Sequence, residues 1–170
     1  MSLEQFNNAP AEDAKKFLRP CLDVDRWVDE IAQARPFASL EDVLKHARTA
    51  AEPFSHQEIE GALAHHPRIG ERAAGTTTEA GMSRSEQAGV DQQDQETITA
   101  LAEGNRDYET KFGHVFLIRA AGRSAGEMLA ALRERLAHTP EQEEPIVAEQ
   151  LREIAVLRLE QSLLERSLSA

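Results

Sequence analysis

The sequence has few of the residues that build sheets or disulfides. Tryptophan, tyrosine and cysteine occur once each, and aromatic residues make up only 5% of the chain. Because aromatic and β-branched residues are the preferred strand formers, we expect no large β-sheet. The single cysteine, Cys21, cannot form an intrachain disulfide, and we interpret it as a small core residue.

Basic residues are also in the minority. The chain has 19 Lys and Arg against 30 Asp and Glu, which gives a formal net charge of −11. A nucleic-acid-binding surface needs clustered Lys and Arg, so we expect no nucleic-acid partner. The sequence shows no secretory signal and no long apolar run, so we expect a cytoplasmic protein with no membrane partner. An anionic small molecule remains compatible with this charge, because a pocket can be locally positive.

The abundant residues are helix formers, chiefly Ala, Leu, Glu, Gln and Arg. Serine followed three residues later by an acidic residue predicts helix starts at Ser39, Ser55 and Ser124. Apolar residues repeat at helical spacing, as in Val24, Trp27, Val28 and Ile31. The length suits one compact domain. We therefore predict an all-α, single-domain bundle of about seven or eight helices over residues 1–170.

Two stretches depart from the helical pattern. Residues 67–82 contain three glycines and three consecutive threonines, and we interpret them as a long ordered loop. Loops of this length inside a compact domain are often functional. Residues 115–118, Val-Phe-Leu-Ile, are too few for a helix and predict a buried extended segment. The last helix is expected to begin near Glu141 or Pro145.

A pair of histidines before a proline is the first candidate for chemistry. Proline disfavours helical backbone in the preceding residue, so a helix should end near His66, just before Pro67. An imidazole there lies at the negative end of the helix dipole, which favours its protonated form and suits a proton donor. The alternative is that His65 and His66 are ordinary residues of a helix end. No metal site is expected, because adjacent histidines on a helix point in different directions.

Two further positions have a structural and a functional interpretation. Ser83 and Glu86 have the spacing of a capping box, which would start a helix without any role in chemistry. Arg158 follows Ile154 by four residues and therefore shares the apolar face of the last helix. An arginine there either has a buried anionic partner or ligand, or extends along the stripe to water.

Five motifs in sequence order resemble those of the 2-oxo-4-hydroxy-4-carboxy-5-ureidoimidazoline (OHCU) decarboxylase family. Each is weak alone, but their order and spacing make the resemblance specific, and it covers roughly residues 10 to 165. One departure is His114, where the family commonly has an aromatic residue. The motifs lie at residues 66–70 (His-Pro-Arg-Ile-Gly), 83–89, 108–118, 122–129 and 149–159.

The resemblance implies an all-α enzyme, usually a homodimer, that needs neither a metal nor an organic cofactor. Its reaction is the last step from urate to (S)-allantoin, and its substrate is a small ureidoimidazoline. By resemblance, His66 is the catalytic acid or base and Glu86 is its charged partner. The residues implied in substrate binding, partly through backbone groups, are Pro67, Ser83, Gln87, Phe116, Ile118, Arg119, Ala120 and Arg158.

The implied chemistry fits these residue types. Loss of carbon dioxide leaves an electron pair that the conjugated C=N and carbonyl of the substrate can accept. The protein therefore has only to position the substrate, stabilise the developing charge and transfer one proton. Two alternatives stay open at this point. The chain could be an inactive helical interaction module on the same scaffold, or a related lyase or hydrolase acting on another ureido compound.

Overall fold

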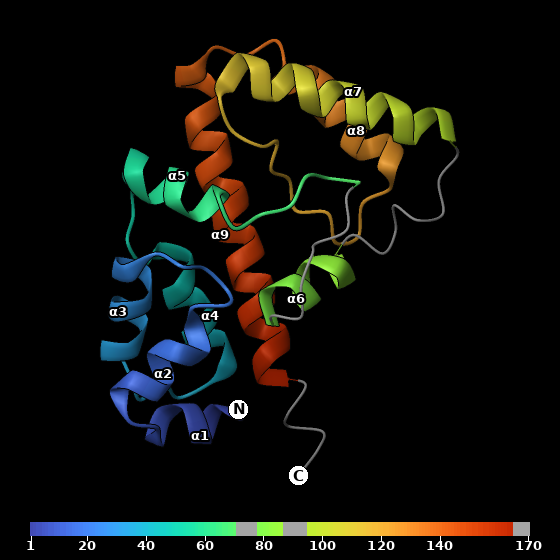
Figure 1. Ribbon diagram of the computed structural model, residues 1–170. Coiled ribbons are helices and arrows are strands. Elements are labelled where there is room, and N and C mark those ends of the chain that lie inside the picture. The colour runs from blue at the N-terminus through green and yellow to red at the C-terminus, as the bar shows by residue number, and fades with distance from the viewer. Residues whose placement is uncertain (71–77, 87–94, 165–170) are drawn as a thin grey trace. The chain divides into compact units, whose positions relative to one another are not determined.

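The computed structural model describes residues 1–70, 78–86 and 95–164, and all regular secondary structure in these residues is α-helical (Figure 1). The predicted all-α class is confirmed, with nine helices in the described residues rather than seven or eight. The helices are α1 (Leu3–Asn8), α2 (Ala11–Leu18), α3 (Asp25–Gln33), α4 (Leu40–Thr49), α5 (His56–Leu63), α6 (Thr78–Glu86), α7 (Gln95–Phe112), α8 (Ala125–Arg135) and α9 (Pro140–Leu164).

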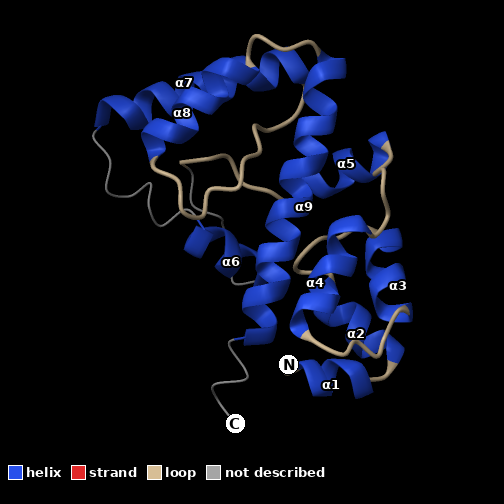
Figure 2. Cartoon of the chain, turned by 180° about the vertical axis from the view of Figure 1, so that it is seen from behind, coloured by secondary structure: helices blue, strands red, loops and turns tan. Residues whose placement is uncertain are grey.

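The helices divide into two compact units, each described by itself. The first unit is Met1–Ala62 with the part of α9 that begins at Arg152, and the second unit is Leu63–Leu151. The first unit thus contains α1 to α4 and nearly all of α5. The second contains α6, α7, α8 and the beginning of the long helix α9 (Figures 1 and 2).

The predicted apolar stripe of α3 forms the centre of the first unit. Val24, Trp27, Val28 and Ile31 are all buried, with exposed fractions of 3% or less. The indole Nε1 of Trp27 donates to the carbonyl of Ala47 at 2.9 Å, which ties α3 to the end of α4. The only tryptophan of the chain therefore contributes both buried apolar area and a satisfied polar group to this core.

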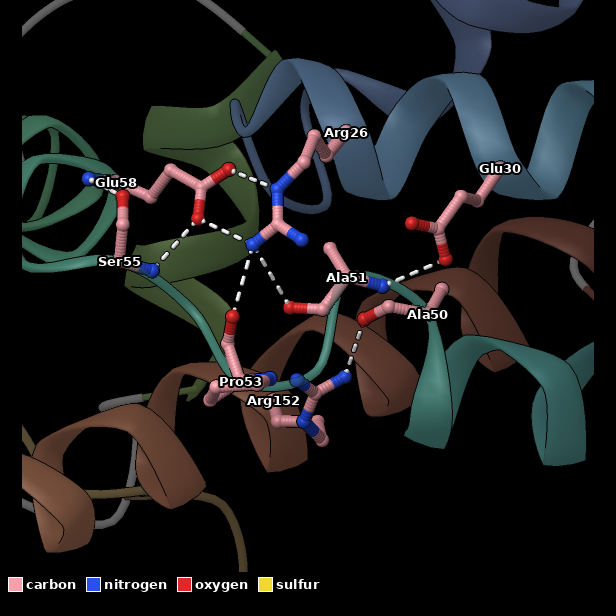
Figure 3. A network of polar contacts seen from close by, with 8 residues as sticks. All are labelled: Arg26, Glu30, Ala50, Ala51, Pro53, Ser55, Glu58 and Arg152. Carbon is pink, nitrogen blue, oxygen red and sulfur yellow. Dashed lines mark hydrogen bonds and ion pairs between the residues drawn. The ribbon is translucent and has the colours of Figure 1, made fainter.

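The linker from α4 to α5 is held by charged side chains (Figure 3). Arg26 of α3 binds the Glu58 carboxylate through Nε and Nη2, at 2.7 Å each, and also donates to the carbonyl of Pro53 at 2.8 Å. Glu30 accepts from the Ala51 amide at 2.7 Å. Arg152 of α9 donates to the carbonyl of Ala50 at 2.7 Å. Linker backbone groups that no helix pairs are thus satisfied by side chains from α3 and α9.

In the second unit α7 and α8 pack against each other, as both views show (Figures 1 and 2). Their close approach depends on Gly104, because a Cβ atom at this position would lie 2.6 Å from Cδ2 of Leu132. The two helices enclose a buried cluster that includes Leu101, Tyr108 and Met128. The same cluster includes three of the candidate site residues, Phe116, Ile118 and Ala120.

The serine-based helix starts are confirmed. The hydroxyls of Ser39, Ser55 and Ser124 accept from the amides three residues later, at 3.1 to 3.2 Å. The structure adds α1, which the sequence interpretation overlooked although Ser2 and Gln5 form a reciprocal capping box. The last helix begins at Pro140, one residue from the earlier of its two predicted starts.

Two predictions about residues 67–86 are wrong. The supposed loop is helical from Thr78 onward, and Ser83 lies in the interior of α6 rather than at its N-cap. Because α6 has weak apolar periodicity, the hydrophobic pattern gave no sign of it, and the capping-box spacing of Ser83 and Glu86 was misleading. Residues 71–77 of the predicted loop lie outside the described residues.

The Arg26–Glu58 pair predicts an acid-sensitive contribution to stability. The hydrogen bond from Arg26 outweighs burial and lowers the pKa of the Glu58 carboxyl to about 2. Since the folded pKa lies below the unfolded one, the charged pair stabilises fully above about pH 5, and its contribution is lost as the pH falls toward 2. Glu58→Gln keeps the capping acceptor and should lower the free energy of unfolding at pH 7 by about 1–2 kcal/mol, a value reduced for the half-exposed Arg26.

The measurement is denaturant unfolding of wild type and variant at pH 7 and pH 3. The difference in the free energy of unfolding between wild type and Glu58→Gln should be less than half as large at pH 3 as at pH 7. Glu52→Gln, at an exposed position of the same linker, is the control and should change little at either pH. An equal cost of Glu58→Gln at both pH values would contradict the ionic origin of the effect.

Candidate active site

The histidine motif lies just beyond the end of α5. This helix ends at Leu63, three residues before the predicted end, and the amide of His66 donates to the carbonyl of Leu63 at 3.0 Å. His65 is exposed, whereas His66 and Pro67 are half-buried. Pro67 explains why the helix does not continue through His66. His66 thus occupies a turn that leaves part of its side chain accessible.

The residues after His66 are fixed to α7 by three contacts. The Ile69 side chain belongs to the buried cluster of the second unit. The Ile69 carbonyl accepts from Nδ2 of Asn105 at 2.8 Å. The guanidinium of Arg68 binds both carboxylate oxygens of Glu109, one turn further along α7. The loop that carries His66 is therefore anchored at its C-terminal side.

Gly70 completes this loop with a φ of +88°. Left-handed backbone of this kind is strained for residues with a Cβ atom and is readily adopted by glycine. The backbone conformation at residue 70 therefore explains why the motif has a glycine there, which the sequence pattern alone did not explain.

Helix α6 carries the second predicted group of site residues. Ser83 is buried, with an exposed fraction of 3%, and Glu86 is half-buried. Because both lie within the helix and three residues apart, they share one side of α6. The purely structural interpretation of Glu86 as a cap for this helix is wrong, so its carboxylate is not needed to start α6. Gln87 lies outside the described residues.

Residues 116–120 are the third group, and they form a non-helical, mostly buried segment, which overlaps the buried extended segment predicted at residues 115–118. Phe116, Ile118 and Ala120 belong to the same cluster as Ile69, which brings this segment and the His66 loop onto one core. Arg119 is half-buried, and its amide donates to Oε1 of Gln150 from the beginning of α9 at 2.9 Å.

A buried polar network behind this segment was missed in the sequence. The carboxylate of Glu143 accepts from the Tyr108 hydroxyl at 2.5 Å and from Nε of Arg135 at 2.6 Å, and Nδ1 of His138 lies 2.9 Å from its other oxygen. Nη1 of Arg135 donates to the Leu117 carbonyl at 2.6 Å. A signal for Arg135 was available, because it follows Leu132 by three residues and so lies beside the apolar stripe of α8.

The electrostatics of this network leave Glu143 charged. Burial alone would raise the pKa of the Glu143 carboxyl, but hydrogen bonds from Arg135, Tyr108 and His138 hold that pKa below its ordinary value. Burial, together with the bond to Glu143, raises the pKa of the Tyr108 hydroxyl far above its usual range. Tyr108 therefore stays protonated and donates to a carboxylate that stays ionised at neutral pH.

Arg158 belongs to the first unit. Its side chain is buried, with an exposed fraction of 1%, and Nη1 lies 3.4 Å from the carbonyl of Pro20. This burial rules out the interpretation in which the guanidinium extends to water. The other interpretation, in which a buried anionic partner or ligand meets the guanidinium, stays a prediction.

Within the described residues, no group of three His, Cys, Asp or Glu side chains could hold a metal ion. No helix in the described part of the chain is both long and apolar enough to cross a membrane.

Comparison with known proteins identifies the family. Residues 7–160 match the sequence profile of the OHCU decarboxylases. The chain belongs to the OHCU decarboxylase family. The matched range covers nearly the whole chain and includes the segments with His66, Ser83 and Arg158.

Individual OHCU decarboxylase relatives support this result. The 2-oxo-4-hydroxy-4-carboxy-5-ureidoimidazoline decarboxylase of Haloferax volcanii is 26% identical over 161 residues, which cover 94% of each chain. The uric acid degradation bifunctional protein of Bacillus sp. (strain TB-90) is 25% identical over 95% of this chain, which spans only 32% of that protein's length. The crystal structure of an OHCU decarboxylase in the presence of (S)-allantoin is similar, with a TM-score of 0.68, 25% identity, and coverage of 91% of this chain and 99% of that one.

At His114, where the family commonly has an aromatic residue, the imidazole ring still packs among aromatic rings. The imidazole ring of His114 is half-buried and meets the Tyr108 ring edge-on, with 5.5 Å between centroids. It also lies near Phe112, with 6.2 Å between centroids. His114 therefore takes the position of an aromatic ring in a cluster of rings.

The hydrogen bond from the Asn105 amide to the Ile69 carbonyl should contribute to stability, and a substitution at Asn105 tests this. In Asn105→Asp a carboxylate replaces the donor and faces the Ile69 carbonyl inside the core. We expect the free energy of unfolding to fall by about 2 kcal/mol or more at pH 7. The pKa of the new carboxyl should be raised in the folded state, so this cost grows as the pH rises from 4 to 7.

Denaturant unfolding at pH 4.5 and pH 7 tests this. Asn8→Asp is a matched control, because the exposed Asn8 amide also donates to a backbone carbonyl, that of Glu4 at 3.0 Å. Asn8→Asp should change the free energy of unfolding little at either pH. A small, pH-independent cost of Asn105→Asp would mean that Asn105 does not anchor the loop.

Proposed function

We propose that this chain decarboxylates 2-oxo-4-hydroxy-4-carboxy-5-ureidoimidazoline to (S)-allantoin, the final step in the degradation of urate to allantoin. The observation that carries the proposal is the family match over residues 7–160. It is supported by His66, which lies on a loop anchored to α7 with its side chain half-exposed. A fixed but accessible imidazole is what stereospecific proton transfer requires.

The reaction breaks the bond between the carboxylate carbon and the ring. Its electron pair moves into the conjugated C=N and carbonyl system of the substrate, and carbon dioxide leaves. A proton is then delivered to one face of the ring carbon, which sets the configuration of the product. In this proposal His66 is the acid or base that handles this proton, and Glu86 fixes the tautomer and favours the charged ring.

The remaining predicted residues bind and orient the substrate. Ser83 and Gln87 contribute side-chain or backbone groups around α6, and Pro67 contributes beside His66. The segment that contains Phe116, Ile118, Arg119 and Ala120 acts partly through its backbone. Arg158 holds an anionic or carbonyl part of the substrate, a role that suits its planar fork of donors.

The proposal also includes three finer expectations: the homodimer and the lack of a cofactor, which the family resemblance implied, and the cytoplasmic location, which was expected from the sequence. The enzyme acts as a homodimer in the cytoplasm and works without a metal or an organic cofactor. The substrate serves as its own electron sink, so the chemistry requires no cofactor for that purpose.

The first test of function is turnover by wild type and His66→Asn. Wild type should convert freshly generated substrate to (S)-allantoin, followed by circular dichroism of the product. His66→Asn should fold normally and lose the catalysed rate by on the order of 10²-fold or more, as expected for a lost acid or base. His65→Asn, at the exposed neighbouring position, is the control and should retain its rate.

An inactive wild type would favour the interaction module instead, and turnover of a different ureido compound would favour the related lyase or hydrolase. Near-normal turnover in folded His66→Asn would remove His66 from the mechanism.

The second test concerns the charge of Glu86. Glu86→Gln keeps the shape of the side chain and removes its charge. Since the carboxylate is not the cap of α6, the melting temperature should change by no more than a few degrees, whereas turnover should fall strongly because His66 loses its charged partner. Glu103→Gln, an exposed substitution of the same kind on α7, should change neither. Unchanged turnover in Glu86→Gln would leave Glu86 without a catalytic role.

A further inference from the structure

The buried Arg135–Glu143 pair lies directly behind residues 116–120. Arg135 and Glu143 have exposed fractions of 5% and 1%. Removing both charges from water is costly, so burial of the pair is only weak evidence that it stabilises the fold.

Arg135 divides its donors between two acceptors. Nε binds Glu143, and Nη1 donates to the Leu117 carbonyl at 2.6 Å. The guanidinium also lies over the Phe116 ring, with 4.7 Å from Cζ to the ring centroid. Glu143 is held in turn by Tyr108 and His138. The carboxylate thus orients the arginine, and the arginine holds the Leu117 carbonyl and packs on the Phe116 ring.

Arg135 binds the carbonyl of the peptide group that joins Leu117 to Ile118, and the same peptide group carries the Ile118 N–H. In a trans peptide the C=O and N–H point in opposite directions, so the Ile118 N–H faces away from Arg135. A charge-assisted bond to the Leu117 carbonyl polarises this peptide group and makes its N–H a stronger donor. The next peptide group is held at its other end, because the Arg119 N–H is bound to Gln150. The Ile118 carbonyl therefore faces away from Gln150.

We propose that Arg135, oriented by Glu143, is a positioning residue of the active site that fixes and polarises the 117–118 peptide group, so that Ile118 presents its backbone to the substrate. This inference rests on the proposed function, in which residues 116–120 line the substrate site. Arg135 itself does not touch the substrate. Its effect is transmitted through one peptide group.

The test compares Arg135→Lys with a matched control. Lysine keeps the positive charge but has no fork that can bind Glu143 and the Leu117 carbonyl together. The control is Arg152→Lys in the first unit, because Arg152 likewise donates to a backbone carbonyl, that of Ala50 at 2.7 Å (Figure 3). Arg152 also lies over a phenylalanine ring, that of Phe54, with 4.2 Å from Cζ to the centroid. Both variants lose a bond to a backbone carbonyl and a contact with a phenylalanine ring, and the proposal assigns only Arg135 to the site.

Two readouts are measured on each folded variant: amide hydrogen exchange of the peptide covering residues 115–122, and kcat and KM. In Arg135→Lys the exchange should speed up by about tenfold or more, and kcat/KM should fall by a similar factor, chiefly through a raised KM. In Arg152→Lys both should stay within about twofold of wild type. Faster exchange in that control should be confined to the linker near Ala50.

If Arg135→Lys does not fold, Glu143→Gln is measured in the same way, because it leaves Arg135 in place but without its charged partner, and the same changes are expected. Normal kinetics together with normal exchange in the folded variant would overturn the proposal, as would equal effects in Arg152→Lys. A wild type without turnover would refute the proposed function instead, and exchange would still decide whether Arg135 fixes this segment.

Discussion

The carboxylate of Glu143 is the interaction on which the second unit depends. It collects hydrogen bonds from Tyr108 of α7, Arg135 of α8 and His138, and so joins three helices at one buried charge. Such a charge is stable in the interior only when every partner is in place. The relative placement of α7, α8 and the beginning of α9 is therefore restricted by the geometry of one carboxylate.

Helix α7 links this carboxylate to the His66 loop. Asn105, Tyr108 and Glu109 are spaced by three and four residues and so lie on one face of the helix. Asn105 and Glu109 hold the loop that follows His66, and Tyr108 holds Glu143. Two segments far apart in the sequence, residues 66–70 and 116–120, are thus positioned by one rigid element. Chemistry that needs fixed geometry is better served by such an element than by the loops alone.

The parts of the fold that could be predicted from sequence are those set by local interactions. Capping serines marked the starts of α4, α5 and α8 because a cap joins residues only three apart. The stripe around Trp27 followed from the helical period alone. The start of α6 was missed because its apolar period is weak, and the Ser83–Glu86 spacing matched a cap that the structure does not form. Local patterns of this kind cannot tell a helix start from a helix interior.

The candidate site divides in the same way. The motif at His66 could be inferred from sequence, because a proline is a local signal. The apolar face placed Arg158 beside the core, but the sequence left open whether its guanidinium is buried or extends to water. The network of Tyr108, Arg135 and Glu143 could not, because its members are separated by up to 35 residues and meet only in the folded chain. The position of Arg135 beside the apolar stripe of α8 was a local signal, but charged residues in a helical sequence usually face solvent, and no local signal identified Glu143 as its partner.

The central claim is that His66 and the backbone of Ile118 face one substrate site, supported from behind by Arg135. A crystal structure of this protein with (S)-allantoin tests it most directly. We expect the ligand to contact the His66 imidazole and the backbone of Ile118, while Arg135 stays bound to the Leu117 carbonyl. A ligand bound elsewhere, such as in the surface groove between Arg19 and Arg26, or one bound to a Leu117 carbonyl that Arg135 has released, would contradict it.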